Sequence, residues 1–164
     1  MENYLLEYDG DLLESGLDII CHQCNCVSTS VSGLAYFLNK KYPFADDCDK
    51  HKNGEFHSLG DLVAHQEPGN PIVFNIYGQY YPGHGGDPGD TKENREAAFH
   101  KILDKIIKLV DHMGIKNPSI GFPCRIGCNL AGGDWNRYHE MITNFALEFH
   151  KVTNGTTHII NKEM

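Results

Sequence analysis

The feature that most constrains this chain is the alternation of short apolar runs with longer segments of helical periodicity. Residues 91–113 form the clearest helix, because Thr91 is a good N-cap, apolar side chains then recur at helical spacing, and Gly114 follows. Residues 17–21 and 119–122 are apolar runs too short for helices, and they fit buried strands. Strands that alternate with helices predict an α/β layered fold with a largely parallel sheet.

The remaining elements follow from the same criteria. A helix is predicted to begin at Gly33, where apolar side chains then share one face, and another begins after Asp134. The sequence further predicts strands over residues 4–8, 62–65, 72–77 and 156–160, and a second short helix around residues 44–52.

The length and composition are those of an ordinary globular protein. The chain has 164 residues, of which 40% are hydrophobic and 22% charged, so we expect one domain over residues 1–164 that needs no disulfides. It contains neither an apolar run of roughly 20 residues nor a basic, then apolar N-terminal segment. We therefore expect a cytoplasmic protein without a membrane partner; the oligomeric state is left open.

The net charge is -8 and the sequence pI is near 5.6. An acidic chain disfavours nucleic acid as a partner, because phosphate contacts along a nucleic acid need a basic surface. A small phosphorylated ligand is still compatible with this charge, because backbone N–H groups bind phosphate without any side-chain cation.

The six cysteines allow three interpretations: disulfides, a zinc site or buried free thiols. Cys21, Cys24 and Cys26 lie close together, with Cys48 and His51 further on. In an extended segment Cys24 and Cys26 face one side and Cys21 the other, and no second Cys-x-x-Cys pair completes a tetrahedral site. Free thiols are favoured, and neither a metal nor a cofactor is expected.

Two loops stand where an α/β sheet binds ligands, at the carboxyl ends of its strands. The first loop, residues 28–35, is rich in small side chains and leads into a helix. The second loop, residues 125–133, holds three glycines and also precedes a helix. Glycines let backbone N–H groups converge, and a helix N-terminus favours an anion. Either loop alone could be an ordinary turn, but the two together favour phosphate binding.

Four motifs resemble those of macrodomains. They are Ile-Cys-His-Gln-Cys-Asn-Cys at residues 20–26, Gly-Leu-Ala at 33–35, Asn-Ile-Tyr-Gly-Gln at 75–79, and Ile-Gly-Cys-Asn-Leu-Ala-Gly-Gly-Asp-Trp at 126–135. The resemblance is strongest to the branch of ADP-ribose-1''-phosphate phosphatases, whose relatives include enzymes that remove ADP-ribose from carboxylate side chains. It implies a three-layer α/β/α sandwich with a mixed, largely parallel central sheet and an ADP-ribose cleft.

The resemblance also implies a set of ligand-binding residues. Asp11 matches the family's acidic residue that accepts a hydrogen bond from the adenine amino group, although the turn Gly10-Asp11 also explains an aspartate there. Asn25 matches the asparagine that contacts the distal ribose. The implied set is Asp11, Leu12, Asn25, Ser32, Gly33, Leu34, Tyr77, Gln79, Arg125, Ile126, Gly127, Cys128, Asn129 and Leu130.

Three side chains are candidates for catalysis. His22 matches a histidine of the phosphatase branch and suits a general acid or base, although a histidine buried beside a strand end explains it equally well. Asn25 would position a water or a ribose hydroxyl. Asp134 is a second acid–base candidate, for which a plain helix N-cap is the stronger interpretation.

The sequence departs from the family pattern in both loops. Residues 30–33 read Ser-Val-Ser-Gly where most relatives have a run of glycines, and Asn129 replaces the more usual glycine. The lysine that one group of ADP-ribosyl hydrolases uses covalently is absent near residues 77–80, and its paired aspartate falls near Ala131. A covalent lysine mechanism is therefore not expected.

Three functions follow as hypotheses. The first is hydrolysis of ADP-ribose-1''-phosphate to ADP-ribose and phosphate. The second is a binding module that holds ADP-ribose or another NAD-derived nucleotide without turnover, which the altered first loop favours. The third is removal of ADP-ribose from macromolecules.

Overall fold

A six-stranded sheet runs through the computed structural model, which describes residues 3–162. The strand order is β1-β6-β5-β2-β4-β3. Within the described residues every strand pairing is parallel except that of β3 with β4. The strands are β1 (Leu5–Asp9), β2 (Ile19–Asn25), β3 (Leu62–His65), β4 (Ile72–Gln79), β5 (Ser119–Pro123) and β6 (Thr156–Asn161).

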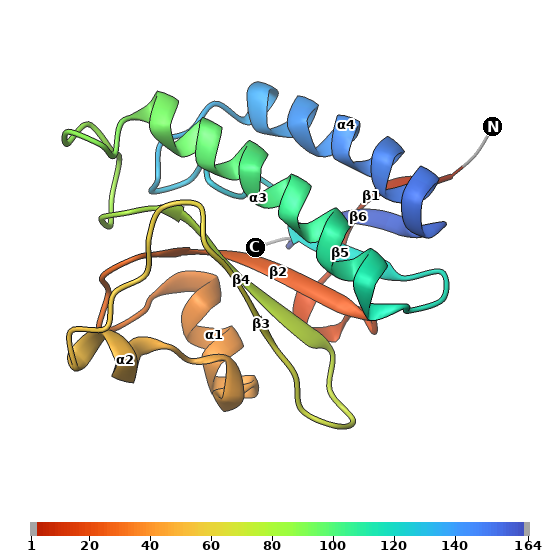
Figure 1. The fold of residues 1–164 in the computed structure, drawn as a ribbon, viewed down its shortest axis with the longest axis horizontal. Helices are drawn as coiled ribbons and strands as arrows, with labels where there is room; N and C mark the ends of the chain where they lie inside the picture. Colours follow the sequence, from red (N-terminus) through yellow and green to blue (C-terminus); the bar gives the residue numbers. More distant parts are fainter. Residues whose placement is uncertain (1–2, 163–164) are drawn as a thin grey trace.

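Helices cover both faces of the sheet. The long helices α3 (Lys92–Met113) and α4 (Trp135–Thr153) lie side by side on one face, and α1 (Gly33–Lys41) and α2 (Cys48–Lys52) lie on the other (Figure 1). The second face also holds two 3-10 turns, η1 (Leu12–Glu14) and η2 (Pro43–Ala45). The predicted α/β/α sandwich with a mixed, largely parallel sheet is confirmed.

The two long helices begin and end where local chemistry dictates. The Thr91 side chain accepts a hydrogen bond from Asn94 N, while the Asn94 side chain accepts one from Thr91 N, which is a reciprocal capping box. Gly114 ends α3 in the left-handed conformation, at φ 70°. The Asp134 carboxylate caps α4 by accepting from Asn136 N, as its position before the helix predicts.

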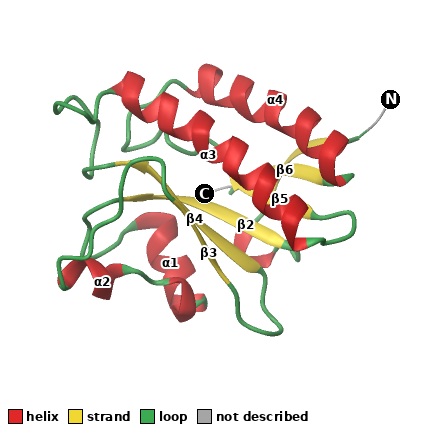
Figure 2. Cartoon of the chain, in the orientation of Figure 1, coloured by secondary structure: helices red, strands yellow, loops and turns green. Residues whose placement is uncertain are grey.

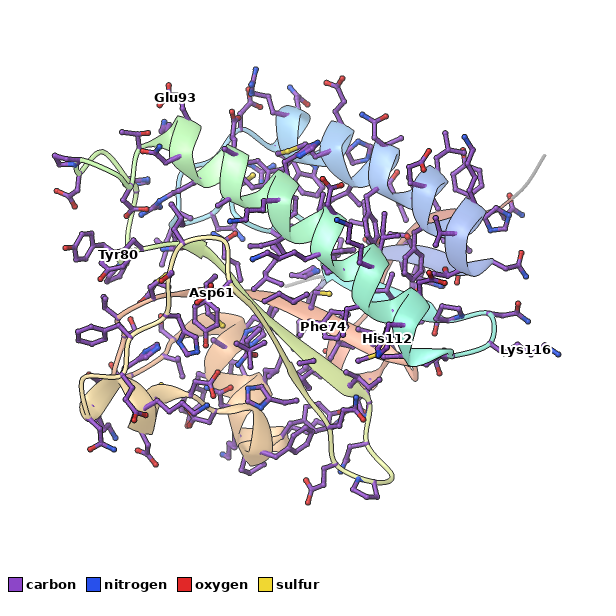
Figure 3. The ribbon with its side chains drawn as sticks, in the orientation of Figure 1. Asp61, Phe74, Tyr80, Glu93, His112 and Lys116 are labelled. Atoms are coloured by element: carbon purple, nitrogen blue, oxygen red, sulfur yellow. The ribbon has the colours of Figure 1, made fainter. Side chains whose placement is uncertain are left out.

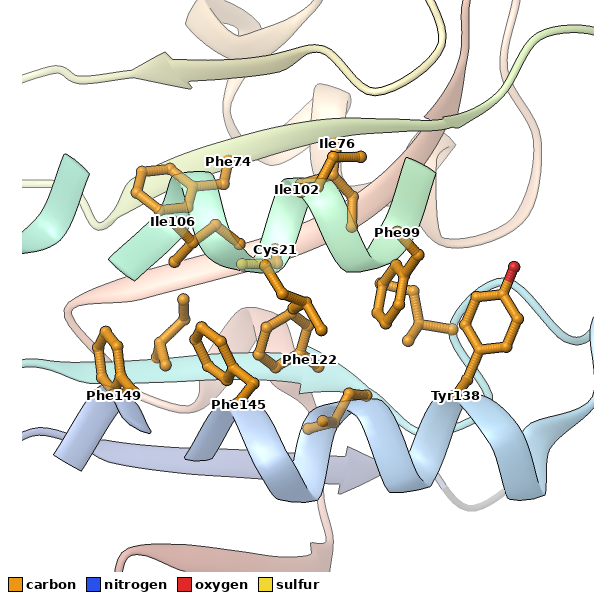
Figure 4. Packing of buried hydrophobic residues seen from close by; sticks show 14 of the residues in the cluster. Cys21, Phe74, Ile76, Phe99, Ile102, Ile106, Phe122, Tyr138, Phe145 and Phe149 are labelled. Carbon is orange, nitrogen blue, oxygen red and sulfur yellow. The ribbon is translucent and has the colours of Figure 1, made fainter. Parts of the chain in front are cut away.

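Most of the core lies between the sheet and the two long helices. Phe145 and Phe149 of α4 stack on each other, and Phe145 meets the ring of Phe122 on β5 edge to face (Figure 4). Cys21 of β2 is fully buried in the same cluster. A smaller cluster around Leu38 fills the opposite face. This packing holds β2 and β5 rigidly, and the predicted binding loops leave from these two strands.

The largest differences from the sequence expectation concern β2 and the helix predicted around residues 44–52. The predicted strand at residues 17–21 starts later and continues to Asn25, because β2 keeps its ladder with β4, with His22 opposite Asn75. The predicted helix around residues 44–52 is instead η2 followed by α2. The chain is extended at Asp46, whose side chain accepts a hydrogen bond from Cys48 N and so starts a new turn.

The loops that follow β2, β4 and β5 gather at one edge of the sheet (Figure 2). Figure 3 marks this edge by Tyr80, directly after β4, and Asp61, directly before the antiparallel β3; His112 and Lys116 lie at the opposite end. None of the helices in the described part of the chain is both long and apolar enough to cross a membrane.

Candidate functional site

A cavity of about 380 Å³ opens at this edge, under the carboxyl ends of β2 and β4. Its mouth is formed by half-buried or exposed side chains of the first loop and by Asn25 and Gln79, and its floor by buried ones. Five of the residues predicted from the sequence line it, namely His22, Asn25, Ser32, Tyr77 and Gln79. The structure therefore brings the distal-ribose part of the predicted site together.

Asn25 shapes the first loop as well as the cavity. Its side-chain oxygen accepts hydrogen bonds from Ser28 N at 2.7 Å and Val27 N at 3.3 Å, which folds the chain back after β2. Because Oδ1 is engaged, the amide nitrogen Nδ2 is the group of Asn25 that is left for a ligand. Asn25 thus offers a donor at the cavity mouth.

The first loop ends at a helix terminus that lacks a side-chain cap. Ser32, the N-cap of α1, is extended, and its hydroxyl makes no capping hydrogen bond. The N–H groups of Ser32, Gly33 and Leu34 have no acceptor within the described residues. Free N–H groups and the helix dipole together attract an anion.

The second loop is held by its own backbone and by two buried side chains. Gly133 N donates to Gly127 O at 3.0 Å, and the side chains of Ile126 and Cys128 lie in the main core. Their backbone N–H groups donate to Pro123 O at 3.1 Å and to Arg125 O at 2.8 Å, so neither residue offers a free side chain or N–H group to a ligand. Arg125, Asn129 and Leu130 point to solvent, and Leu130 is 75% exposed.

Gly127 is required by geometry in this loop. Its φ is 75°, and a Cβ atom there would lie 2.6 Å from the Tyr138 ring. A side chain would be strained in this conformation and would displace a core aromatic ring. The glycine lets the loop pass close to the side chains of Tyr138 on α4 and Gln23 on β2.

A network of buried polar side chains forms the floor of the cavity. The carboxylate of Asp47, which lies just before α2, accepts hydrogen bonds from Tyr77 OH at 2.8 Å and from Asn75 Nδ2 and His65 Nε2, both at 3.1 Å. Burial alone would raise the pKa of Asp47, but the hydrogen bonds from His65 and Tyr77 hold that pKa well below its usual value. Asp47 is therefore a buried carboxylate anion at neutral pH.

Asn75 connects this carboxylate to His22. Its Nδ2 donates to two pure acceptors, Ala45 O at 2.7 Å and Asp47 Oδ2. Asn75 Oδ1 must therefore face His22 Nε2, 2.6 Å away, which fixes the proton of neutral His22 on Nε2. Burial lowers the pKa of His22 to about 4, although the hydrogen bond to Asn75 opposes the shift.

His22 should consequently remain neutral at any pH near 7. In the unfolded chain an imidazole titrates near pH 6.5, whereas folded His22 titrates near pH 4. The unfolded chain binds the extra proton between these values, so this contribution to stability is complete above about pH 6.5 and lost as the pH falls toward 4, on the order of 3 kcal/mol. NMR titration of the His22 ring checks this; an apparent pKa above about 6 would contradict the buried, neutral assignment.

Similar proteins were found by sequence and by structure. No family model matches the chain. An uncharacterized 17.5 kDa protein from the tk-vs intergenic region of Enterobacteria phage T4 is 27% identical over 133 residues, which cover 77% of this chain and 79% of that protein. The macrodomain of Mycobacterium tuberculosis DarG aligns with a TM-score of 0.73 at 19% identity, covering 95% of this chain and 96% of that one.

The chain has the macrodomain fold. A Bacteroides thetaiotaomicron protein of unknown function shares this fold, with a TM-score of 0.72 and 23% identity over 96% of this chain and 97% of that chain. A Trypanosoma brucei macrodomain solved in complex with ADP-ribose aligns with a TM-score of 0.64 and 14% identity, over 97% of this chain and 63% of that one.

Within this macrodomain fold, eleven of the sixteen predicted site residues do not line the cavity; eight of them belong to the two loops, and the other three are Asp11, Leu12 and Asp134. Asp134 lies at the N-cap of α4 and lines a separate hollow with Lys92 and Arg137, so the structure does not bring it together with His22 and Asn25. Asp11 accepts a hydrogen bond from Leu13 N, and its other oxygen lies 3.4 Å from Lys162 Nζ. The Leu12 side chain is buried in the smaller core, so only its backbone is available to a ligand.

The sequence interpretation missed most of the polar floor. Asp47 and His65 belong to none of the motifs, and Asn75 belongs to the motif at residues 75–79 without a predicted role, because the three residues are far apart in the chain and no local spacing connects them. His51 was considered only as a zinc ligand, yet its Nδ1 donates to Ser28 O and its Nε2 accepts from His57 Nδ1 at 2.7 Å. One signal was present in the sequence: His65 and Asn75 are polar residues within the apolar strands predicted at residues 62–65 and 72–77.

Proposed function

We propose that this protein binds ADP-ribose or a derivative of it along the edge of the sheet where the two loops lie. The observation that carries the proposal is the uncapped N-terminus of α1 beside the glycine-rich second loop. β2 and β5 are adjacent and parallel, so both loops leave from the same edge. Two sets of backbone N–H groups at one edge suit a diphosphate.

The remaining groups of the ligand find partners on either side of the diphosphate. Asn25 Nδ2 would donate to the distal ribose at the cavity mouth, and Asp11, at the end of β1, would accept from the adenine amino group. The structures solved with ADP-ribose include macrodomains of Trypanosoma brucei and, as a point mutant, Oceanobacillus iheyensis, both of the same fold. Calorimetry with ADP-ribose tests the proposal. The proposal fails if the folded protein shows no heat of binding.

Replacing Asp11 tests the adenine contact. Asp11→Ala should weaken ADP-ribose binding by about 1–3 kcal/mol if a buried hydrogen bond to adenine is lost. Glu14→Ala is the matched control, because Glu14 lies in the same turn and pairs only with Lys41 at the surface. Equal affinities of Asp11→Ala and the wild type would assign Asp11 to the turn alone.

Hydrolysis of ADP-ribose-1''-phosphate is the reaction that the motif resemblance points to. In that reaction water attacks the terminal phosphorus, the bond to the ribose oxygen breaks, and ADP-ribose and inorganic phosphate leave. His22, through its unprotonated Nδ1, is the nearest base to Asn25 on β2. The test is phosphate release from this substrate; a rate equal to that of buffer, with folded protein, rejects it.

Binding without turnover has its own support in the site. His22 is buried, and its pKa near 4 leaves it without a proton to give to a leaving group near pH 7. Asp134 is committed to capping α4. Tight binding of ADP-ribose together with inertness toward ADP-ribose-1''-phosphate and toward ADP-ribosylated macromolecules would identify a binding module.

A further inference from the structure

The cavity extends past Asn25 into a buried inner wall made by His22, Ala45, Asp47, His51, Asn75 and Tyr77. We infer that this inner wall is a subsite for the group carried on the distal ribose, and that it accepts an uncharged or cationic group bearing N–H or O–H donors and rejects a terminal phosphate. The inference rests on the proposed binding of ADP-ribose, and it specifies which derivative the site prefers.

The first observation is the charge of the cavity. Asp47 lines it with a side chain only 5% exposed, and none of the described residues that line the cavity is a lysine or an arginine. The nearest cation to Asp47, Lys50 Nζ, is 3.9 Å from Oδ1 but lies outside the lining. A phosphate monoester carries close to two negative charges near pH 7, so it would lie near a buried anion in a cavity whose own lining offers it no lysine or arginine.

The second observation is that the donors of the inner wall are already used. Tyr77 OH and Asn75 Nδ2 donate to Asp47, and the second hydrogen of Asn75 Nδ2 goes to Ala45 O. His51 Nδ1 donates to the carbonyl oxygen of Ser28. A phosphate offers only acceptors, and acceptors need donors when they are taken out of water.

The third observation is that the wall retains an acceptor. Because Asn75 Oδ1 accepts a hydrogen bond from His22 Nε2–H, Nδ1 of neutral His22 holds a lone pair. The nearest polar atom recorded for this nitrogen is Cys24 Sγ, 3.9 Å away. A carboxamide, an amino group or a hydroxyl on the distal ribose matches an anionic wall that accepts and does not donate.

The experiment compares three ligands on the full chain by calorimetry near pH 7.5: ADP-ribose, ADP-ribose-1''-phosphate and NAD⁺. The nicotinamide of NAD⁺ places a cationic pyridinium ring with a carboxamide on the distal ribose. ADP-ribose-1''-phosphate should bind at least about tenfold more weakly than ADP-ribose. NAD⁺ should bind either more tightly than ADP-ribose or less than about tenfold more weakly. A smaller penalty for the phosphate, or a larger one for NAD⁺, overturns the inference while leaving the proposed function intact. Absence of ADP-ribose binding instead rejects the proposed function.

Two variants assign the discrimination to the wall. Asp47→Asn removes the charge with little change of shape, and Asn39→Lys adds a cation from α1 to the same lining. Each folded variant should reduce the penalty for the phosphate by at least about threefold. Asp49→Asn is the control, because Asp49 is exposed and outside the cavity. If the folded variants bind ADP-ribose-1''-phosphate as much more weakly than ADP-ribose as the wild type does, the assignment is overturned.

Discussion

Replacing Arg95 with methionine should lower the free energy of unfolding by about 3–5 kcal/mol, the cost of leaving a buried charge without its partner. Arg95 is 2% exposed and forms a two-pronged ion pair with Asp90, with Nε–Oδ1 at 2.9 Å and Nη2–Oδ2 at 2.8 Å. Methionine keeps most of the side-chain volume, so the loss reports the ion pair and the hydrogen bonds of Arg95 to backbone carbonyls rather than a cavity. Urea unfolding followed by circular dichroism measures it.

The same substitution should reach the proposed binding site. Arg95 also donates to Gly83 O and to Ala131 O, and thereby ties the glycine-rich segment after β4 to the second loop. Hydrogen exchange in residues 81–90 and 127–133 should therefore accelerate together. Arg137→Met is the control, because Arg137 pairs with Glu96 at the surface and should leave the unfolding midpoint unchanged. An unfolding midpoint of Arg95→Met that is as close to the wild-type value as that of Arg137→Met would contradict this account.

Replacing Asp47 with alanine should be comparably costly, at least about 3 kcal/mol. The change leaves Tyr77 OH, Asn75 Nδ2 and His65 Nε2 without their shared acceptor, and each unsatisfied buried donor costs about 1–3 kcal/mol. Asp49→Ala, two residues along, removes an exposed carboxylate whose partner is Lys52, and it should unfold at the wild-type urea concentration. Similar midpoints for the two variants would show that the polar floor contributes nothing.

The contribution of Asp47 should also depend on pH. Its pKa is depressed in the folded chain, so between that value and the ordinary pKa near 4 the unfolded chain binds the proton more readily. The stabilisation is therefore complete above about pH 4 and declines as the pH falls further. Urea unfolding should be measured between pH 5 and pH 3, about one unit on either side of the ordinary pKa. The free energy of unfolding should fall more steeply over this range for the wild type than for Asp47→Asn.

Local signals in the sequence were sufficient for the two long helices. The capping residues Thr91 and Asp134 predicted the starts of α3 and α4, because a cap acts on N–H groups within one turn of itself. The glycines of the second loop predicted a tightly curled backbone, and Gly127 and Gly132 both have positive φ values of 75°. The same signals could not bound β2, since its last residues are polar and stay in the sheet only through pairing with β4.

The sequence by itself determined the α/β class, the two long helices and the strands after which the two loops follow, because periodicity, capping and strand-to-loop order are properties of neighbouring residues. Only the tertiary structure decided what lies beneath that edge. The donors to Asp47 come from positions 18, 28 and 30 residues further along the chain, and they meet because β3 and β4 pair beside it. The buried charge of the inner wall and its already engaged donors both result from these contacts with Asp47. No spacing in the sequence predicts the contacts.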